Sequence, residues 1–305
     1  MLTRDDLPTE PFTLSQALDR GISRWDLEQA VHARLLHRLL RGVYVRTDVR
    51  DTIALRCRAA SLVLSRHTVV RDRTAAWLHG IDVFDYHETE ILPPLETSVL
   101  RWHEPTRRAD HVGGTRDLAP RDIQQVHGLS VTTPMRTALD LGCALPPRHG
   151  LAMLDAFARH YGFARSQLER EALRYRRRRG VVQLRRLLSM VDARAESPAE
   201  SWTRYCMLDA GLPAPELQWW VDVGGVPTYR LDLAYPRHRV AVEYDGEEFH
   251  TSPDARRRDE ERRAWLRAHG WIVIVVRRDG FGPRAVEAWT GEVRAALASR
   301  TWRAS

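Results

Sequence analysis

Two neighbouring β-forming runs constrain the fold of this 305-residue chain more than any other feature: "TYRLDLAY" at 228–235 and "HRVAVEYD" at 238–245. Both are rich in residues that favour strands, and a short connection joins them, so they are predicted to form an antiparallel hairpin. Carboxylates interrupt both runs, at Asp232, Glu243 and Asp245. A buried strand is ordinarily apolar, so three acids in one hairpin indicate a function beyond solubility.

The predicted hairpin places the three acids on one face of the sheet. If Tyr235 pairs with His238, Asp232 lies diagonal to Glu243, and diagonal neighbours are ~7–8 Å apart at the backbone. Glu243 and Asp245 are two residues apart, so their side chains point the same way, ~7 Å from each other along the strand. The opposite face is expected to carry the apolar residues of the runs: Leu231, Leu233, Val240, Val242 and Tyr244.

Like charges at these distances destabilise one another unless a proton or a cation lies between them. A hard divalent cation, Mg2+ (or Mn2+), is the expected partner because such ions prefer oxygen ligands. Asp232, Glu243 and Glu200 are the predicted ligands; Glu200 lies on the helix predicted before the sheet, with Glu196 one turn earlier. His250 is predicted to act as an acid, a base or an orienting donor. The predicted catalytic set is Asp232, Glu243, Asp245, His250 and Glu200.

The alternative is that these acids form ion pairs with arginines. Arginine supplies all 47 basic residues of the chain. Arg230, Arg239 and the "RRRDEERR" helix at 256–263 are the candidate partners. Acid clusters mark functional sites only statistically, so both interpretations are kept at this point.

Residues 192–305 are predicted to form a mixed β-sheet flanked by helices. The predicted order is helix 198–210, strands 217–223, 228–235 and 238–245, helix 254–269, strand 271–277 and helix 283–299. This order of a helix glutamate, a strand aspartate and E-x-D followed by G-x-x-x-H resembles the PD-(D/E)xK nuclease superfamily. The nearest branch is the one similar to the very-short-patch repair endonuclease. The quoted stretches are "ESPAES", "RLDLAYP", "VAVEYDGEEFH", "RRRDEERRAWLRAHGW" and "IVIVVR".

That resemblance implies a restriction-endonuclease-like fold and a role for specific residues. Asp232 and Glu243 would bind the metal, Glu200 would assist from its helix, and His250 would lie near the scissile phosphate. The chain departs from the superfamily at Asp245, which stands where the pattern has a lysine that normally helps to position the attacking water. Metal coordination with help from His250 would then carry the reaction; the alternative is a site without turnover.

The segment from 13 to 47 is predicted to form a helix, a tight turn, a second helix and a β-ribbon. Leu14, Ala17 and Leu18 form an apolar stripe, Gly21 ends the first helix, and Ser23 caps the second. "LLRGVYV" then supplies a glycine-centred bend, as a wing would. This spacing is typical of a helix-turn-helix that reads the major groove, with an ordinary helical hairpin as the alternative. The segment resembles the winged-helix N-terminal domain of AbiEi-type antitoxins.

Residues 51–191 are predicted to form a middle α/β region with a helical connector, and their pattern resembles the middle region of AbiEi-like proteins. The run "RYRRRRG" at 174–180 is more typical of a solvated helix end than of a phosphate-contacting ridge. The chain is therefore predicted to be an α+β multidomain protein. The predicted domains are 1–50 (winged helix-turn-helix), 51–191 (middle region) and 192–305 (nuclease).

The formal net charge of +7 supports a polyanionic partner, namely DNA, with a general compositional bias toward arginine as the alternative. The chain has no apolar stretch of the ~20 residues that a membrane helix needs, so we expect a cytoplasmic protein without a membrane partner. The expected function is a metal-dependent DNA endonuclease, with a toxin or antitoxin as a further partner. The alternative is a non-catalytic DNA-binding regulator of the antitoxin type, and an RNA nuclease ranks lower. Predicted DNA contacts are Arg24, Gln29, Arg38, Arg41, Arg257 and Arg258.

Overall fold

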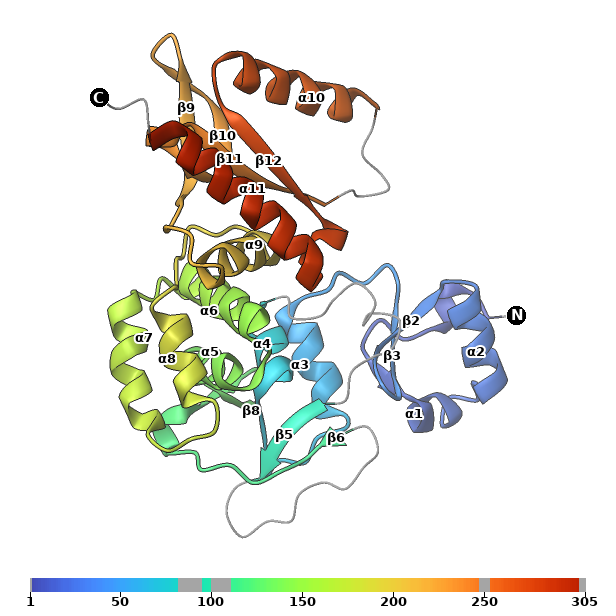
Figure 1. Cartoon of the computed structure of the whole chain (residues 1–305). Helices are drawn as coiled ribbons and strands as arrows, with labels where there is room; N and C mark the ends of the chain where they lie inside the picture. The colour runs from blue at the N-terminus through green and yellow to red at the C-terminus, as the bar shows by residue number, and fades with distance from the viewer. Residues whose placement is uncertain (1, 82–94, 100–110, 247–252, 302–305) are drawn as a thin grey trace. The chain divides into compact units, whose positions relative to one another are not determined.

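The computed structural model describes residues 2–81, 95–99, 111–246 and 253–301 (Figure 1). The chain forms two compact units, Met1–Leu141 and Gly142–Ser305. The described residues combine helices with three β-sheets, so the mixed α+β class is confirmed. The three predicted domains do not coincide with the two units. None of the described helices combines the length and apolar character required to cross a bilayer.

The N-terminal part of the first unit has the predicted order of helix, turn, helix and β-ribbon. Ser23 caps the second helix, since its Oγ accepts the N–H of Asp26 at 3.1 Å and the Asp26 carboxylate accepts the N–H of Ser23. Leu18 is 54% exposed and so does not join the predicted apolar stripe, whereas Ala17 is buried. The elements are η1 (Arg4–Asp6), β1 (Phe12–Thr13), α1 (Leu14–Leu18), α2 (Arg24–His32), β2 (Leu36–Leu40) and β3 (Val43–Arg46), in a sheet of order β1-β3-β2.

The rest of the first unit contains a five-stranded sheet of order β6-β5-β4-β8-β7. Its elements are α3 (Ile53–Ser61), β4 (Thr68–Val70), α4 (Asp72–Leu78), β5 (Leu95–Val99), β6 (His111–Val112), η3 (Pro120–Asp122), β7 (Ile123–Val126), β8 (Leu129–Thr132) and α5 (Pro134–Ala144). The last of these helices continues into the second unit.

A buried network of charged side chains joins α5 to the segments before it. Arg136, which is 2% exposed, donates to Asp140 at 2.7 Å and to Asp122 at 2.8 Å. Arg116 then bridges Asp140 at 2.9 Å and Asp72 at 2.5 Å. Buried charges are tolerated only when they are paired, and each carboxylate of this network faces a guanidinium.

The second unit begins with helices that pack against its sheet-bearing part. Its elements are α6 (Pro147–Tyr161), α7 (Arg165–Ala172), η4 (Leu173–Tyr175), α8 (Val181–Leu188), α9 (Pro198–Asp209), β9 (Glu216–Val223), β10 (Val226–Tyr235), η5 (Pro236–His238), β11 (Val240–Asp245), α10 (Pro253–Ala268), β12 (Ile272–Arg277), η6 (Arg278–Phe281) and α11 (Pro283–Thr301). Asp155 on α6 and Arg204 on α9 form a buried ion pair at 2.5 Å. The predicted domain boundary near residue 192 therefore lies inside one compact unit.

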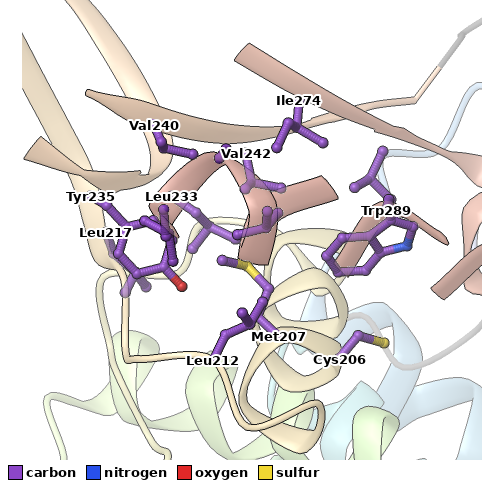
Figure 2. Close-up of a cluster of buried hydrophobic side chains, with 14 of the residues drawn as sticks. Cys206, Met207, Leu212, Leu217, Leu233, Tyr235, Val240, Val242, Ile274 and Trp289 are labelled. Carbon is purple, nitrogen blue, oxygen red and sulfur yellow. The ribbon is translucent and has the colours of Figure 1, made fainter. Parts of the chain in front are cut away.

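The sheet of the second unit has the order β12-β11-β10-β9, with only β11 and β12 parallel (Figure 1). Helices cover both faces. On one face, α9 and α11 contribute Met207 and Trp289 to a core with Leu233 and Val242 (Figure 2). On the other face, Leu266 of α10 packs against β10 and β11. Burial on both faces explains why "IVIVVR" of β12 is continuously apolar.

Candidate functional site

The pairing of β10 with β11 brings two of the predicted acids close together. Leu233 pairs with Val242 at the end of this ladder, and Asp232 and Glu243 are the next residues beyond it. The negative charge of Glu243 acts on Asp232, so the two carboxylates lie within electrostatic reach of one another.

The predicted register of this hairpin was wrong by two residues. Tyr235 pairs with Val240 rather than with His238. The connection is longer than predicted because η5 occupies it and Arg239 follows in a left-handed conformation, with φ of 48°. An error of two residues preserves the face on which each side chain lies, so the acids still come together.

The regular alternation of faces breaks at Asp232. Leu231 packs on the α10 side of the sheet with Leu266, whereas Leu233 packs on the α9 and α11 side. The prediction that both leucines share one face was therefore wrong. On the adjacent strand, Gln218 lies opposite this point and has φ of 54°. Local departures of this kind re-aim side chains, and they are common next to functional sites.

Glu200 is buried at the start of α9 and is held by three donors. Its Oε1 accepts the hydroxyl of Ser197 at 2.9 Å, and its Oε2 accepts Nε2 of Gln218 at 2.7 Å and the N–H of Glu196 at 3.0 Å. Glu196 precedes the helix rather than lying one turn earlier on it, and its carboxylate pairs with Arg230 at 2.7 Å. The position of the Glu200 carboxylate is thus fixed by the polypeptide itself.

Gln218 belongs to this site, although no pattern in the sequence indicates it. Its amide nitrogen is used by Glu200, while its buried Oε1 has no hydrogen-bond partner among the described residues. A glutamine in a strand is an ordinary residue, and only the register and the left-handed backbone bring it to the acids. The open acceptor suits a ligand that donates a hydrogen bond or carries positive charge.

Arginines of α10 occupy the carboxylates of β11. Glu243, which is 2% exposed, receives Nη1 and Nη2 of Arg262 at 2.6 and 2.8 Å. Arg263 pairs with Asp245 at 3.0 Å and also with Asp259 at 2.8 Å. Glu243 and Asp245 thus form the ion pairs with arginines that were the alternative to a metal site, and α10 supplies the arginines.

Asp232 differs from Glu243 and Asp245 in that no arginine forms an ion pair with it among the described residues. Burial, together with the negative charges of Glu200 and Glu243, raises the pKa of Asp232 to about 7, despite an opposing hydrogen bond from the N–H of Tyr244. The negative charges on α9 and β11 thus act on the acid of β10.

The donor types at this site suit a hard divalent cation, since they are three carboxylates and an amide oxygen. However, across the described ranges no three side chains among His, Cys, Asp and Glu are arranged to hold a metal ion together. Both oxygens of Glu243 face the guanidinium of Arg262. His250 lies in 247–252, outside the described residues.

The predicted DNA contacts are all exposed, but they come from different elements. Arg24 and Gln29 lie on α2, Arg38 on β2, Arg41 in the turn after it, and Arg257 and Arg258 on α10. The second helix also presents Trp25, which is 66% exposed and which the sequence analysis did not select. An aromatic residue directly after Arg24, at the start of the second helix, was the available signal.

Comparison with known proteins places part of the chain in a recognised class. Residues 68–190 match the AbiEi antitoxin C-terminal domain. The chain is also 34% identical over 255 residues to "Uncharacterized protein Rv2248" of Mycobacterium tuberculosis strain ATCC 25618 / H37Rv, covering 84% of this chain and 90% of that protein. The same values hold for "Uncharacterized protein MT2308" of strain CDC 1551 / Oshkosh. The chain belongs to the Rv2248 family.

For this member of the Rv2248 family, the predicted AbiEi resemblance is confirmed over residues 68–190. The matched segment runs from β4 to just beyond α8, so it spans the buried Arg136 network but ends before Glu200. A match to an antitoxin domain suggests a component of a toxin–antitoxin system. The acidic site lies outside the match, and the resemblance of its segment to nucleases stays a prediction.

Proposed function

We propose that this protein is a DNA-binding component of a toxin–antitoxin system whose C-terminal segment is a metal-dependent DNA endonuclease. The observation that carries the proposal is the position of Asp232, which is electrostatically coupled to both Glu200 and Glu243 where the strand alternation breaks. A buried acid without an arginine partner is costly in a strand that serves packing alone. The mixed sheet with helices on both faces supports the restriction-endonuclease-like fold that we propose for this segment.

The proposed metal ligands are Asp232, Glu243 and Glu200, and Mg2+ or Mn2+ is the proposed ion. When bound, the ion would act as a Lewis acid toward a phosphodiester and would lower the pKa of water. Gln218 and Ser197 hold the Glu200 carboxylate in place by the hydrogen bonds described above. Because the Glu200 carboxylate is already held in place, less free energy is needed to bring it to a metal beside Asp232 and Glu243.

Arg262 and Arg263 would change partners in the active arrangement. Both guanidinium groups lie beside the acids, and Glu243 can serve a metal only if Arg262 releases it. A released guanidinium is well suited to bind a phosphate in a bidentate manner. His250 is proposed to act as a proton donor or acceptor near the scissile phosphate, in the absence of a lysine at the position of Asp245.

Targeting to DNA is proposed for the winged-helix region. Arg24 and Gln29 on α2 would face the major groove, with Arg38 and Arg41 of the β-ribbon beside the phosphate backbone. The exposed arginines at the start of α10, Arg257 and Arg258, would hold the backbone near the acidic site.

A second candidate function is a DNA-binding regulator of the antitoxin type without nuclease turnover. The bidentate pair between Arg262 and Glu243 favours it, because such a pair satisfies the buried acid without a metal. The aspartate at position 245 also favours it. The two candidates share the DNA-binding region and differ only in what the acidic site does.

A cleavage assay separates the two functions. Wild-type protein is incubated with supercoiled plasmid, mismatched duplex and single-stranded DNA, with Mg2+ or Mn2+, beside Asp232→Asn and Glu243→Gln. Cleavage by the wild type that both variants lose supports the nuclease. Cleavage that persists in the variants indicates a contaminant. Sequence-dependent DNA binding without cleavage under any condition supports the regulator.

A further inference from the structure

The positive charge of this chain is concentrated in one segment of the second unit. Residues 165–186, which form α7, η4 and α8 with their connections, contain nine arginines and only two glutamates. Their excess of seven positive charges equals the formal net charge of the whole chain, +7. The remaining residues are thus neutral on balance, so the segment is a distinct electrostatic feature rather than an average property of the protein.

Five arginines of this segment form what we call the arginine surface. All five are exposed, and within the described part of the chain no ion pair or hydrogen bond engages their side chains. They are Arg170, Arg176, Arg177, Arg179 and Arg185. Several exposed arginines elsewhere have acid partners, such as Arg194 with Asp192 at 2.8 Å and Arg58 with Glu10 at 2.7 Å.

The loop that carries the central arginines has a fixed shape. Tyr175 is 1% exposed and anchors the loop, with the guanidinium of Arg178 over its ring at 4.7 Å. Arg177 has φ of 64° and Gly180 has φ of 81°. A Cβ on Gly180 would lie 2.2 Å from the carbonyl oxygen of Cys143, so only glycine fits against α5 here. The fold therefore gives the loop a defined backbone, at the end of α7 and η4 where the sequence favoured a solvated helix end.

Like charges held close to one another raise the free energy of the folded state unless an anionic partner neutralises them. A single left-handed arginine adds a further cost of order 1 kcal/mol. A polyanion with regularly spaced charges suits such a surface, and exposed arginines bind phosphate through two N–H groups at once.

We infer that the arginine surface binds the phosphate backbone of double-stranded DNA, independently of sequence and of the acidic site. The inference rests on the proposed DNA partner and adds a second contact region to the one proposed for α2 and its β-ribbon. Contacts of this kind position a protein on the duplex and supply salt-dependent affinity, while sequence is read elsewhere.

An acidic protein is the competing occupant of this surface. Leu173 and Val182 are 67% and 79% exposed and lie beside the arginines, and arginine with apolar side chains is also a composition found at protein interfaces. Charge decides in favour of DNA: two apolar residues stand against five guanidinium groups that have no acid partner in the part of the chain that the structure describes.

The test measures how DNA affinity depends on salt. Full-length wild type, the triple variant R176Q/R177Q/R179Q and a control triple variant are titrated against a fluorescent duplex of mixed sequence, with EDTA present to prevent cleavage. The control is R58Q/R165Q/R194Q, which removes the same charge from arginines that are 50–55% exposed and paired with acids. Thermal unfolding first verifies that both variants fold.

Neutralising each phosphate contributes a slope of about 0.9 to the plot of log affinity against log salt. For the loop variant R176Q/R177Q/R179Q we expect the magnitude of this slope to fall by about 2–3 and the affinity to fall at least ~10-fold near 0.15 M salt. The control variant is expected to keep the wild-type slope. Equal losses in both variants would overturn the inference, because net charge alone would then explain binding.

The remaining outcomes separate this inference from the proposed function. A wild type that binds duplex, with an unchanged slope in the loop variant, overturns the arginine surface and leaves the proposed function intact. A wild type that binds no duplex at any salt concentration overturns both. A second titration replaces the duplex with poly-glutamate, which stands in for an acidic protein. If the loop variant binds duplex as the wild type does but no longer binds poly-glutamate, the surface is assigned to an acidic protein and the DNA assignment is overturned.

Discussion

The guanidinium of Arg262 binds both carboxylate oxygens of Glu243, at 2.6 and 2.8 Å, beside Asp232, whose pKa is raised to about 7 by burial and by neighbouring negative charges. The bidentate arginine places its positive charge beside this carboxylate, so it competes with a divalent cation for Glu243. If a metal displaces the guanidinium, Arg262 becomes free to contact a phosphate. The state of this pair therefore distinguishes a latent nuclease from a structural ion pair.

Replacing Arg262 tests this competition. Arg262→Gln leaves Glu243 buried without its bidentate partner, which we expect to lower the free energy of unfolding by about 2–4 kcal/mol in EDTA. Mn2+ should then raise the unfolding midpoint of the variant more than that of the wild type, because the ion replaces the lost cation. Urea unfolding with and without Mn2+ measures both effects.

The matched control for this variant is Arg257→Gln on the same helix. Arg257 is 71% exposed and, within the described residues, forms an ion pair with Glu261 at 3.6 Å. We expect it to change stability by less than about 0.5 kcal/mol, with or without metal. An Arg262→Gln protein that behaves like this control would exclude the proposed competition.

The raised pKa of Asp232 predicts a pH dependence of stability. Between pH ~4 and 7 the folded protein keeps a proton on Asp232 that the unfolded chain has already released. This group therefore makes the protein less stable as pH rises through that range, and its effect is constant above about pH 7. As pH rises from 4.5 to 8, the free energy of unfolding of Asp232→Asn should increase by about 1–3 kcal/mol relative to that of the wild type.

Urea unfolding of both proteins at pH 4.5, 6 and 8, in EDTA, checks this expectation. The comparison of variant with wild type cancels the titration of the other carboxylates. A stability difference that stays constant across the three pH values would mean that Asp232 is ionised like an exposed acid.

The buried network in the AbiEi-matched segment should be essential for folding. Arg136→Met removes the guanidinium that Asp122 and Asp140 share and leaves buried charge behind. We expect a loss of about 3–5 kcal/mol in the free energy of unfolding. Arg121→Gln, at an exposed position one residue before Asp122, is the control and should cost less than about 0.5 kcal/mol. Comparable losses in the two variants would contradict a special role for the network.

Gly180 should be required for the shape of the arginine loop. Gly180→Ala places a Cβ 2.2 Å from the carbonyl oxygen of Cys143 in addition to the cost of φ at 81°. Gly162→Ala shares the positive φ, at 67°, but its Cβ would meet nothing within 4 Å. We expect Gly162→Ala to lower the free energy of unfolding by about 1 kcal/mol and Gly180→Ala to lower it by at least about 2 kcal/mol more, as measured by urea unfolding. Equal losses in the two variants would show that the structure relaxes to relieve the contact between the added Cβ and the Cys143 carbonyl oxygen.

The sequence predicted the elements of the second unit well because hydrophobic pattern and capping residues determine them locally. The helix expected at 254–269 is Pro253–Ala268, and the strand expected at 271–277 is Ile272–Arg277. The hairpin register was missed because the left-handed Arg239 lengthens the connection, and arginine carries no signal for that conformation.

The candidate site was predictable in its acids but not in its partners. Spacing alone put Glu243 and Asp245 on one face, and a register error of two residues left Asp232 beside them. The contribution of Gln218 depends on a break in strand alternation that no local pattern indicates. The arginine run on α10 suggested ion pairs, yet only the packing of that helix selects Arg262 for Glu243.

Binding of Mn2+ in the absence of DNA is the most direct test of the acidic site. Electron paramagnetic resonance reports the free ion during titration of the wild type, Asp232→Asn and Arg262→Gln. We expect saturable binding by the wild type, loss of that binding in Asp232→Asn, and tighter binding in Arg262→Gln. Indistinguishable titrations of the wild type and Asp232→Asn would contradict it.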